Sequence, residues 1–399
     1  MNLLYLGSLT SYLTQNDLRV FRDLGYTVTV LNPYPITGNP PGGLIEFDNA
    51  VNLYDQKRLG TLYATIGGTL TSVLLSVLKR KMDVIRKITN NRQIEAIYAA
   101  WGSNMIPLIR MIQKEKLSIP TVYDFLTYPQ NLFKWKVTLE NLYCKGSIES
   151  IDARIHCSRN MYEYMRSRFD LKKQGRDIIL PKFFSKSYFY NKRLPLLSDA
   201  DGEPHVVFIG PTSFSLPWDD IRQDVYGISR EKIHFHLVHT NAPMERNPYI
   251  HFFKYFPLKE IIKGSLANFM TQFDACIILF NFNRGWCINR FHTSLPSRFL
   301  FALNAGIPII MPRGYLLACE EFVNKHQIGF SYKNPKHLKE ILSDDTLIRK
   351  YRKNAVEKAF NFTCEKNFHK LDKLIRAVAR ASAMIVDKEY RKLLSLKLQ

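Results

Sequence analysis

The stretch 293–310, TSLPSRFLFALNAGIPII, decides the fold of this chain. Ser294 or Ser297 can cap a helix whose first turn contains Pro296, and Gly306 suits the left-handed conformation that ends many helices. An apolar run with the composition of a buried strand follows directly. The stretch therefore predicts a helix, a tight turn and a strand, which together form the repeating unit of a parallel α/β sheet.

The start of this helix is also a candidate anion site. In a doubly wound sheet such a helix begins at the carboxyl edge of the strands, where its free N–H groups and its dipole attract phosphate. Arg298 adds a forked cationic group in the first turn. A diphosphate fits these features, and an ordinary capped helix with a solvated Arg298 fits the same residues.

Short apolar runs alternate with helical patterns on both sides of this stretch. In the first half we expect a helix at 16–24 and strands at 3–6, 27–31, 96–99, 120–123, 153–157 and 178–180. In the second half we expect a helix at 258–273 and strands at 205–209, 233–238, 249–253 and 274–280. The alternation predicts two α/β units with parallel sheets.

The best linker is the polar, turn-rich segment 191–204. We therefore expect an N-terminal domain at 1–190 and a C-terminal domain at 205–364. Residues 365–399 have a helical pattern with apolar residues on one side, which we expect to return to the N-terminal domain. The alternative for the end of the chain is contact with lipid, because basic residues there lie among leucines.

The run from Ser294 to Pro308 resembles, without gaps, the SLP-x-K-x-x-E-Y-x-x-x-G-x-P element of GT-B glycosyltransferases. The likeness is to the large group of bacterial retaining enzymes known as family 4 or glycosyl transferases group 1. The stretch 152–161 is similar to a strand-and-serine pattern in the first half of that family. The resemblance implies a GT-B fold, with two Rossmann-like α/β domains facing a cleft, and a nucleotide diphosphate sugar as donor.

One position departs from the family pattern. Arg298 matches the basic position, but Phe301 stands where the family usually has the glutamate that holds the donor ribose hydroxyls. A phenyl ring accepts no hydrogen bond from a ribose. Three explanations stay open: the donor is held differently, the register differs locally, or the chain has lost catalysis and kept the fold.

The resemblance and the residue pattern give a set of donor-side candidates. Backbone and side-chain contacts to the sugar nucleotide are expected from Thr293, Ser294, Leu295, Ser297, Asn283, Arg284, Gly210, His239 and Phe256. In the first domain, Gly7 and Ser8 follow the first strand and can let a substrate approach the backbone. His239 alone at a strand end is also compatible with a local hydrogen-bonding role.

Three residues are candidates for the chemistry itself. Retaining enzymes of this type need the leaving diphosphate neutralised, and they need neither a protein nucleophile nor a metal ion. Arg298 and then Arg290 supply forked donors where that charge develops. Asp124 follows an expected strand and could orient an acceptor hydroxyl, act as a base, or stabilise a turn.

Other site chemistries find no support in the sequence. The pair Asp199 and Asp201 has the spacing of a metal-binding Asp-x-Asp motif but lies in the expected linker, so we interpret it as a turn and expect no metal site. The chain has no Walker loop, dinucleotide fingerprint or nucleophile elbow. Its six cysteines are far apart and are expected to be reduced thiols.

The charge balance indicates a polyanionic partner. Lys and Arg number 56 against 35 Asp and Glu, a formal net charge of +21. The stretch 62–78 is too interrupted to span a bilayer, and the basic residues at 79–87 allow it either to lie on an anionic leaflet or to be a core helix with a solvated end. No nucleic-acid-binding module accompanies the charge, which disfavours nucleic acid as partner.

Together these features predict a cytoplasmic enzyme, with peripheral association at the inner face of the membrane as an option, because the N-terminus resembles a first strand rather than a signal peptide. The expected reaction transfers a sugar from a nucleotide diphosphate sugar to a saccharide or lipid-linked acceptor, with retention. The alternative is a catalytically silent GT-B subunit that binds and stabilises a partner transferase.

Overall fold

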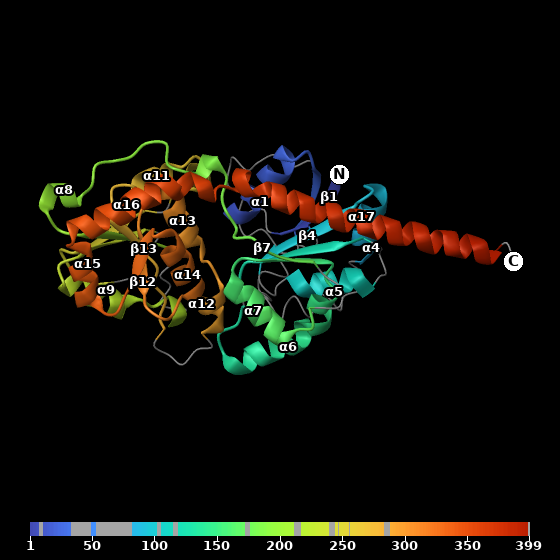
Figure 1. Ribbon diagram of the computed structural model, residues 1–399, viewed down its shortest axis with the longest axis horizontal. Helices are drawn as coiled ribbons and strands as arrows, with labels where there is room; N and C mark the ends of the chain where they lie inside the picture. Colours follow the sequence, from blue (N-terminus) through green and yellow to red (C-terminus); the bar gives the residue numbers. More distant parts are fainter. Residues whose placement is uncertain are drawn as a thin grey trace. The chain divides into compact units, whose positions relative to one another are not determined.

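The structure is a computed structural model that describes residues 1–7, 11–32, 49–52, 82–101, 105–114, 119–171, 176–210, 217–238, 244–245, 247–254, 256–282 and 288–397. The chain forms two compact units. Unit 1 comprises Met1–Pro181 with Asn367–Gln399, and unit 2 comprises Lys182–Lys366. Each is a parallel sheet flanked by helices (Figure 1).

Unit 1 contains a seven-stranded sheet in the order β3-β2-β1-β4-β5-β6-β7, in which every neighbouring pair is parallel. The strands are β1 Asn2–Leu6, β2 Thr27–Asn32, β3 Asn49–Asn52, β4 Ala96–Trp101, β5 Thr121–Phe125, β6 Ala153–His156 and β7 Arg176–Ile179. The helices are α1 Tyr12–Asp23, α4 Met82–Asn91, α5 Ile106–Lys114, α6 Lys134–Glu149 and α7 Arg159–Arg168.

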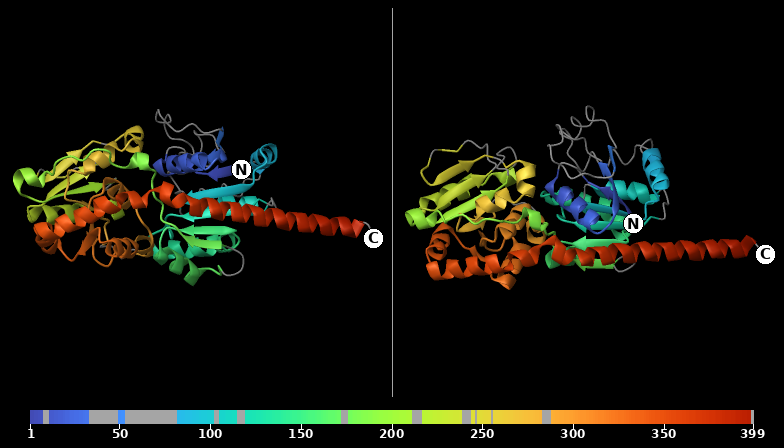
Figure 2. Two further views of the ribbon diagram at one scale, coloured as in Figure 1. Left: turned by 45° about the horizontal axis from the view of Figure 1, so that its top comes forward. Right: turned by 90° about the horizontal axis from the view of Figure 1, so that it is seen from above.

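The strand β1 shows why this sheet lies at the centre of unit 1. Leu4 and Leu6 point into a core shared with α4, α5, α6 and α7, whereas Tyr5 on the other face packs against Phe21 of α1. Both faces are therefore buried, as parallel strands require. Figure 2 shows helices on either side of the sheet.

Unit 2 contains a six-stranded parallel sheet in the order β10-β9-β8-β11-β12-β13. The strands are β8 His205–Ile209, β9 His234–Val238, β10 Ile250–Phe253, β11 Ala275–Ile277, β12 Ile309–Pro312 and β13 Gly329–Tyr332. The α-helices are α8 Ser198–Asp201, α9 Arg222–Arg230, α10 Leu258–Ile262, α11 Ser265–Met270, α12 Asn289–Thr293, α13 Ser297–Ala305, α14 Leu317–His326, α15 Pro335–Leu342 and α16 Asp345–Ala359. Short 3-10 turns lie at Lys186–Tyr188 (η3), Pro217–Asp219 (η4) and Phe360–Phe362 (η5).

The deciding stretch folds largely as predicted. It forms α13 and then β12, and Gly306 ends the helix in the left-handed region at φ +58°. The capping prediction is wrong, because Pro296 is the residue before the helix and no side chain caps it. Pro296 has extended backbone, and Ser297 is already the first helical residue.

Two expected boundaries also differ from the structure. The residues expected as a linker, 191–204, pack within unit 2, where the Leu194 N–H donates to Thr271 and the Ser198 hydroxyl to Asp274. The single helix expected at 258–273 is two helices, because Gly264 breaks it at φ +80°. The unit boundary therefore falls at Pro181 and Lys182, earlier than the end of the expected first domain.

The final helix, α17 Cys364–Lys397, begins in unit 2 and belongs to unit 1 from Asn367 onwards. Within unit 1 the Tyr26 hydroxyl donates to Asp372 at 2.7 Å, and the Arg376 guanidinium donates to the same carboxylate at 2.7 Å. Lipid contact was one of two alternatives for the stretch 62–78 and for the end of the chain. The stretch 62–78 and the side chains of the last helical turns lie outside the described residues. In the part of the chain that the structure describes, no helix is both long and apolar enough for a membrane span.

Candidate functional site

Arg298 lies at the carboxyl edge of the second sheet. The residue is 7% exposed, and its Nη1 donates to the carbonyl of Leu279, just beyond β11, at 2.6 Å. Its guanidinium carbon is 4.4 Å from the ring centroids of both Phe208 in β8 and Phe280. The cation is therefore held between two aromatic rings, at the edge where doubly wound sheets bind their ligands.

Gly210, directly after β8, makes room for this cation. A Cβ atom at this position would lie 3.0 Å from Nη2 of Arg298. The guanidinium would have to shift by a few tenths of an ångström, and the backbone at φ +142° is a conformation that side chains rarely adopt. The structure thus brings the predicted Gly210 and Arg298 together, from elements far apart in the sequence.

Asp219 is a third charged group in this region and one that sequence reasoning missed. It lies in η4, where burial raises the pKa of its carboxyl group while the charges of Arg298 and then Arg290 lower it. Both arginines are therefore close enough to act electrostatically on one carboxylate. No motif surrounds Asp219 in the sequence, so only the fold reveals it.

The residues at the junction of α12 and α13 are buried. Thr293, the last residue of α12, is 3% exposed, and Ser294 and Leu295 are 7% and 8% exposed. The Thr293 hydroxyl donates to the carbonyl of Arg290 at 3.4 Å. The Ser294 Oγ has no hydrogen-bond partner among the described residues. A buried hydroxyl without a protein partner is normally satisfied by an ordered water or by a ligand.

Phe301 occupies an aromatic stack. Its ring lies 5.3 Å from that of Phe184 with an interplanar angle of 15°, and Phe184 in turn stacks on Tyr188 at 4.8 Å. Phe301 is 6% exposed. The position at which the family pattern has glutamate is therefore part of the apolar core of unit 2 in this chain.

The other donor-side candidates are placed only in part. Phe256 packs against Phe269 of α11, with ring centroids 5.3 Å apart. Asn283, Arg284, His239 and, in the first unit, Ser8 lie outside the described residues. Their roles stay predictions.

Asp124 is not at the end of a strand, as the sequence suggested, but inside β5 and 3% exposed. It accepts a hydrogen bond from the Tyr98 hydroxyl at 2.8 Å, Tyr98 stacks on Tyr5, and the Tyr5 hydroxyl donates to Asp17 of α1 at 2.8 Å. Burial and the two carboxylates raise the pKa of both tyrosines, which stay protonated donors. Asp124 is therefore part of a buried network of tyrosines and carboxylates. An acceptor could contact Asp124 only if this network opened.

Gly7 packs against Tyr5, a member of this network. Its N–H donates to the carbonyl of Leu31 at 3.3 Å, and a Cβ atom here would collide with the Tyr5 ring and approach the Thr14 hydroxyl. Packing alone thus requires glycine at this position, besides any approach of substrate. The tyrosine–carboxylate network was missed in the sequence because its members are spread over β1, α1, β4 and β5.

A separate cluster lies at the amino ends of the strands in unit 2. Asp201, His205 and His234 place ligand-type atoms within 4.8 Å of one another. Asp201 was interpreted above as part of a turn. The structure instead ends α8 at this residue and brings its carboxylate to two imidazoles. Of the six cysteines, the five that the structure describes are buried and form no disulfide with one another.

The two sheets and their helices define the GT-B fold of glycosyltransferases, and comparison with solved structures supports this assignment. A sucrose-phosphate synthase from Thermosynechococcus elongatus is 13% identical, with a TM-score of 0.62 over 99% of this chain and 100% of that one. A glycosyltransferase from Rickettsia africae is 10% identical, with a TM-score of 0.62 over 94% and 98%. The Anabaena protein HepE, solved in complex with UDP, is 12% identical, with a TM-score of 0.56 over 97% and 100%.

No protein-family model matches the chain, and no curated protein matches it by sequence. The similarity to the solved structures is therefore one of fold: the chain has the GT-B architecture over nearly its whole length.

Proposed function

We propose that this protein is a glycosyltransferase that transfers a sugar from a nucleotide diphosphate sugar to an acceptor, with retention of configuration. The observation that carries the proposal is the position of Arg298, held between Phe208 and Phe280 at the carboxyl edge of the second sheet. Support comes from the fold, since the similar HepE structure contains UDP. The donor diphosphate would lie at this edge.

The chemistry follows from the charge that the reaction creates. As the bond between the sugar and the diphosphate breaks, negative charge grows on the leaving oxygen, and fixed cations beside it lower the barrier. Arg298 is immobilised by its hydrogen bond to Leu279, so it needs little reorganisation. Arg290 supplies a second cation. The charges of both arginines act on the carboxyl group of Asp219. This arrangement needs no metal ion at the diphosphate.

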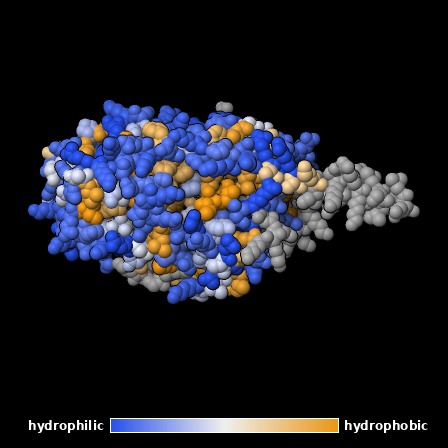
Figure 3. Space-filling model, viewed as in Figure 1, coloured by the Kyte–Doolittle hydropathy of each residue, from blue (hydrophilic) through white to orange (hydrophobic). Residues whose placement is uncertain are grey.

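We further propose that the acceptor is presented at an anionic membrane, as a lipid-linked saccharide or glycolipid precursor. The supporting feature is the outer face of α6, where Trp135, Leu139 and Leu142 are 61%, 55% and 68% exposed. These residues recur at helical spacing and form an exposed apolar stripe. In Figure 3, hydrophobic residues reach the surface at the lower edge of the molecule, in the region of α6.

Basic side chains border this α6 stripe. The Lys136 ammonium lies 5.1 Å from the Phe133 ring centroid and 5.3 Å from that of Trp135. Lys134 and Lys145 are exposed on the same helix. An apolar face with aromatic residues and flanking lysines, in a chain of net charge +21, suits an anionic lipid interface.

The direct test is turnover. The purified protein is incubated with UDP-, GDP- and ADP-sugars and with lipid-linked saccharides in anionic vesicles, and nucleotide release and the anomeric form of the product are measured. We expect one donor class to be used, and Arg290→Ala to lower kcat by about 100-fold. Arg349→Ala, in an exposed part of α16, is the matched control and should leave kcat unchanged. Product of inverted configuration would contradict the proposed stereochemistry.

The stack of Phe301 on Phe184 favours a second candidate function, a silent subunit that stabilises a partner transferase. In that case the chain lacks the carboxylate that would hold the ribose and turns over none of the donors, alone or with acceptor. Co-purification of an active transferase with this chain, together with absent turnover by the chain itself, would establish the second function instead of the first.

A further inference from the structure

Four histidines form a stacked ladder at the amino ends of three adjacent strands in unit 2. His205 begins β8 and pairs in register with His234, the first residue of β9, while His236 pairs with His251 of β10. The centroid of the His205 ring lies 4.3 Å from that of His234 with an interplanar angle of 6°, and the His236 and His251 rings are 4.5 Å apart. All four side chains therefore lie on one face of the sheet.

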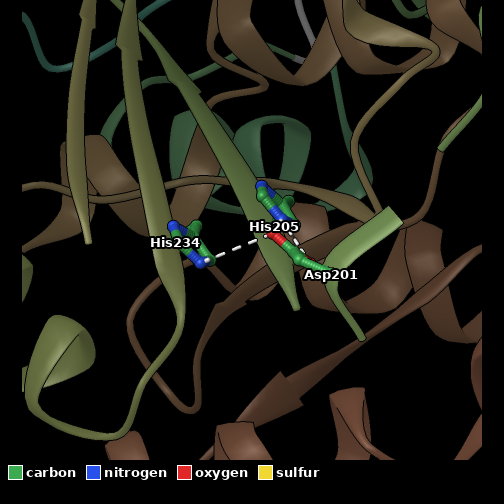
Figure 4. A group of neighbouring side chains, drawn as sticks. All are labelled: Asp201, His205 and His234. Carbon is green, nitrogen blue, oxygen red and sulfur yellow. Dashed lines mark hydrogen bonds and ion pairs between the residues drawn. The ribbon is translucent and has the colours of Figure 1, made fainter. Parts of the chain in front are cut away.

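Two of these imidazoles converge on one carboxylate, as Figure 4 shows. The Nε2 of His205 is 2.9 Å from Oδ2 of Asp201, and the Nε2 of His234 is 3.7 Å from the same oxygen. Oε2 of Glu203 lies 3.0 Å from the Nε2 of His234. Ligand atoms of a tetrahedral zinc ion with bonds of about 2.0–2.1 Å are separated by about 3.3 Å. The ligand-type atoms of Asp201, His205 and His234 all lie within 4.8 Å of one another, so side-chain rotations would bring them to that spacing.

The second ring nitrogens are engaged in a way that suits metal ligands. Nδ1 of His205 is 2.8 Å from Nε2 of His236, and Nδ1 of His234 is 2.8 Å from Nε2 of His251. In the tautomer that donates a hydrogen bond from each Nδ1, each Nε2 keeps a free lone pair on the side of the Asp201 and Glu203 carboxylates. Fixing of the ligand imidazole through its other nitrogen is the usual outer shell of a protein metal site.

The access of the cluster also favours a cation. Neutral imidazoles and ionised carboxylates are the forms that bind metal. The side chains of Asp201 and Glu203 are 43% and 32% exposed, so an ion has a path from solvent.

We propose that Asp201, His205 and His234, with Glu203 as a fourth ligand, form a binding site for a divalent transition metal, best fitted by Zn²⁺. Two imidazole nitrogens and two carboxylate oxygens are a donor set that zinc accepts in tetrahedral geometry. The ion would tie the short helix α8 to the first residues of β8 and β9. Because these residues lie at the amino ends of the strands and Arg298 lies at the carboxyl edge, the metal would stabilise unit 2 and take no part in donor chemistry.

The test measures zinc binding by the full-length protein directly. The protein is stripped with a chelator and titrated with Zn²⁺ in competition with a chromophoric chelator, and Co²⁺ is added separately for its visible absorption. We expect one equivalent of Zn²⁺ per chain and the intense visible bands of four-coordinate Co²⁺. His205→Asn combined with His234→Asn should weaken binding by at least 100-fold, about 2.7 kcal/mol, whereas His369→Asn, an exposed histidine of α17, should leave it unchanged.

Asp201→Asn distinguishes loss of a metal ligand from misfolding of the double histidine variant. Asp201 is partly exposed and both histidines remain in place, so this variant is expected to fold. We expect this variant to keep its circular dichroism spectrum and to lose most of the rise in Tm that Zn²⁺ gives the unaltered protein. Absence of stoichiometric zinc binding, or binding of equal strength by the double histidine variant, would overturn the proposal. Nucleotide binding is measured in parallel and is expected to be unchanged in all of these variants, so failure here is distinct from failure of the proposed function.

Discussion

At the residue scale, Phe301 shows how one substitution changes what a position can do. The family pattern places a hydrogen-bonding carboxylate there, whereas this chain stacks Phe301 on Phe184 inside unit 2. The sequence predicted the missing carboxylate, but it could not predict the stack, because Phe184 comes from a segment more than a hundred residues away. The consequence is that Phe301 contributes mainly to stability.

Phe301→Ala should therefore destabilise unit 2 by about 3–5 kcal/mol, the usual cost of removing a buried phenyl group. Chemical denaturation followed by fluorescence measures this free energy. Phe360→Ala is the control, since that ring is 39% exposed and its loss should cost clearly less. Equal costs for the two variants would show that the Phe301 stack is not a packed part of the core.

Asp224 of α9 gives a pH-dependent prediction. Burial raises the pKa of its carboxyl group to about 6, above the value of about 3.9 in an unfolded chain. The folded state then binds more protons than the unfolded state between these two values, so stability falls as pH rises from about 4 to about 6 and stays lowered above that. Asp224→Asn should remove this slope and stabilise the protein at pH 7 by about 1–2 kcal/mol, allowing for partial solvent exposure.

Denaturation midpoints of the unaltered and Asp224→Asn proteins, compared from pH 4 to pH 7, test this directly. The difference between them should grow with rising pH and level off above about pH 6. A difference that is constant over the whole range would show that Asp224 titrates as an ordinary exposed carboxylate.

At the element scale, the parallel strands were the most predictable features and the helix boundaries the least. The apolar runs at β1, β2, β4, β8 and β12 are buried on both faces, so composition alone locates them. The strand β3, with the sequence NAVN, lies at the edge of its sheet and carries too few apolar residues to be predicted. The predicted cap of α13 is wrong because the residue before the helix is Pro296, so neither Ser294 nor Ser297 caps it.

The break between α10 and α11 illustrates the same point. The apolar periodicity runs through 258–273, and only the conformation of Gly264 divides it. With φ at +80°, Gly264 allows a turn that an alanine resists, and a Cβ atom would collide with the carbonyl of Phe189.

Gly264→Ala should lower the free energy of unfolding by about 2–3 kcal/mol through left-handed strain and this clash. Thermal unfolding measures the loss. Gly146→Ala provides the control, because no atom lies within 4 Å of a Cβ at that position of α6. The alanine at position 146 should be neutral or slightly stabilising, and the reverse order of the two variants would contradict the structural reason.

At the scale of the whole molecule, the charge and the two-unit organisation were readable from composition and alternation, whereas the sites were not. Arg298 and Gly210 were both identified, but their contact depends on β8, β11 and α13 meeting at one edge. The proposed metal site combines Asp201 of α8 with the histidine ladder of β8, β9 and β10, and it escaped prediction because no two of its ligands form a recognisable metal-binding motif. Sequence patterns reveal elements, and only the fold assembles side chains from different elements.

The net charge and the α6 stripe lead to a prediction about membranes. The protein should sediment with vesicles that contain anionic lipid and not with neutral ones, because flanking lysines add to the apolar contact. Trp135→Glu combined with Leu139→Glu should reduce the bound fraction at least tenfold. Leu317→Glu, at an exposed apolar residue of α14, is the matched control and should bind like the unaltered protein.

Binding that is equal for both variants would place the lipid contact elsewhere than α6. Binding that weakens steeply with salt in the unaltered protein, and is lost in neither variant, would indicate that the cationic surface acts without the apolar stripe.

The central claim is that the edge of the second sheet around Arg298 binds the diphosphate of a sugar nucleotide. Calorimetric titration with UDP, GDP and ADP, repeated on Arg298→Ala and on the Arg349→Ala control, tests it most directly. We predict that one of the three nucleotides binds, that Arg298→Ala weakens this binding at least tenfold, about 1.4 kcal/mol, and that the control does not. Absence of binding by all three, or equal affinity in the Arg298→Ala protein, would contradict the account.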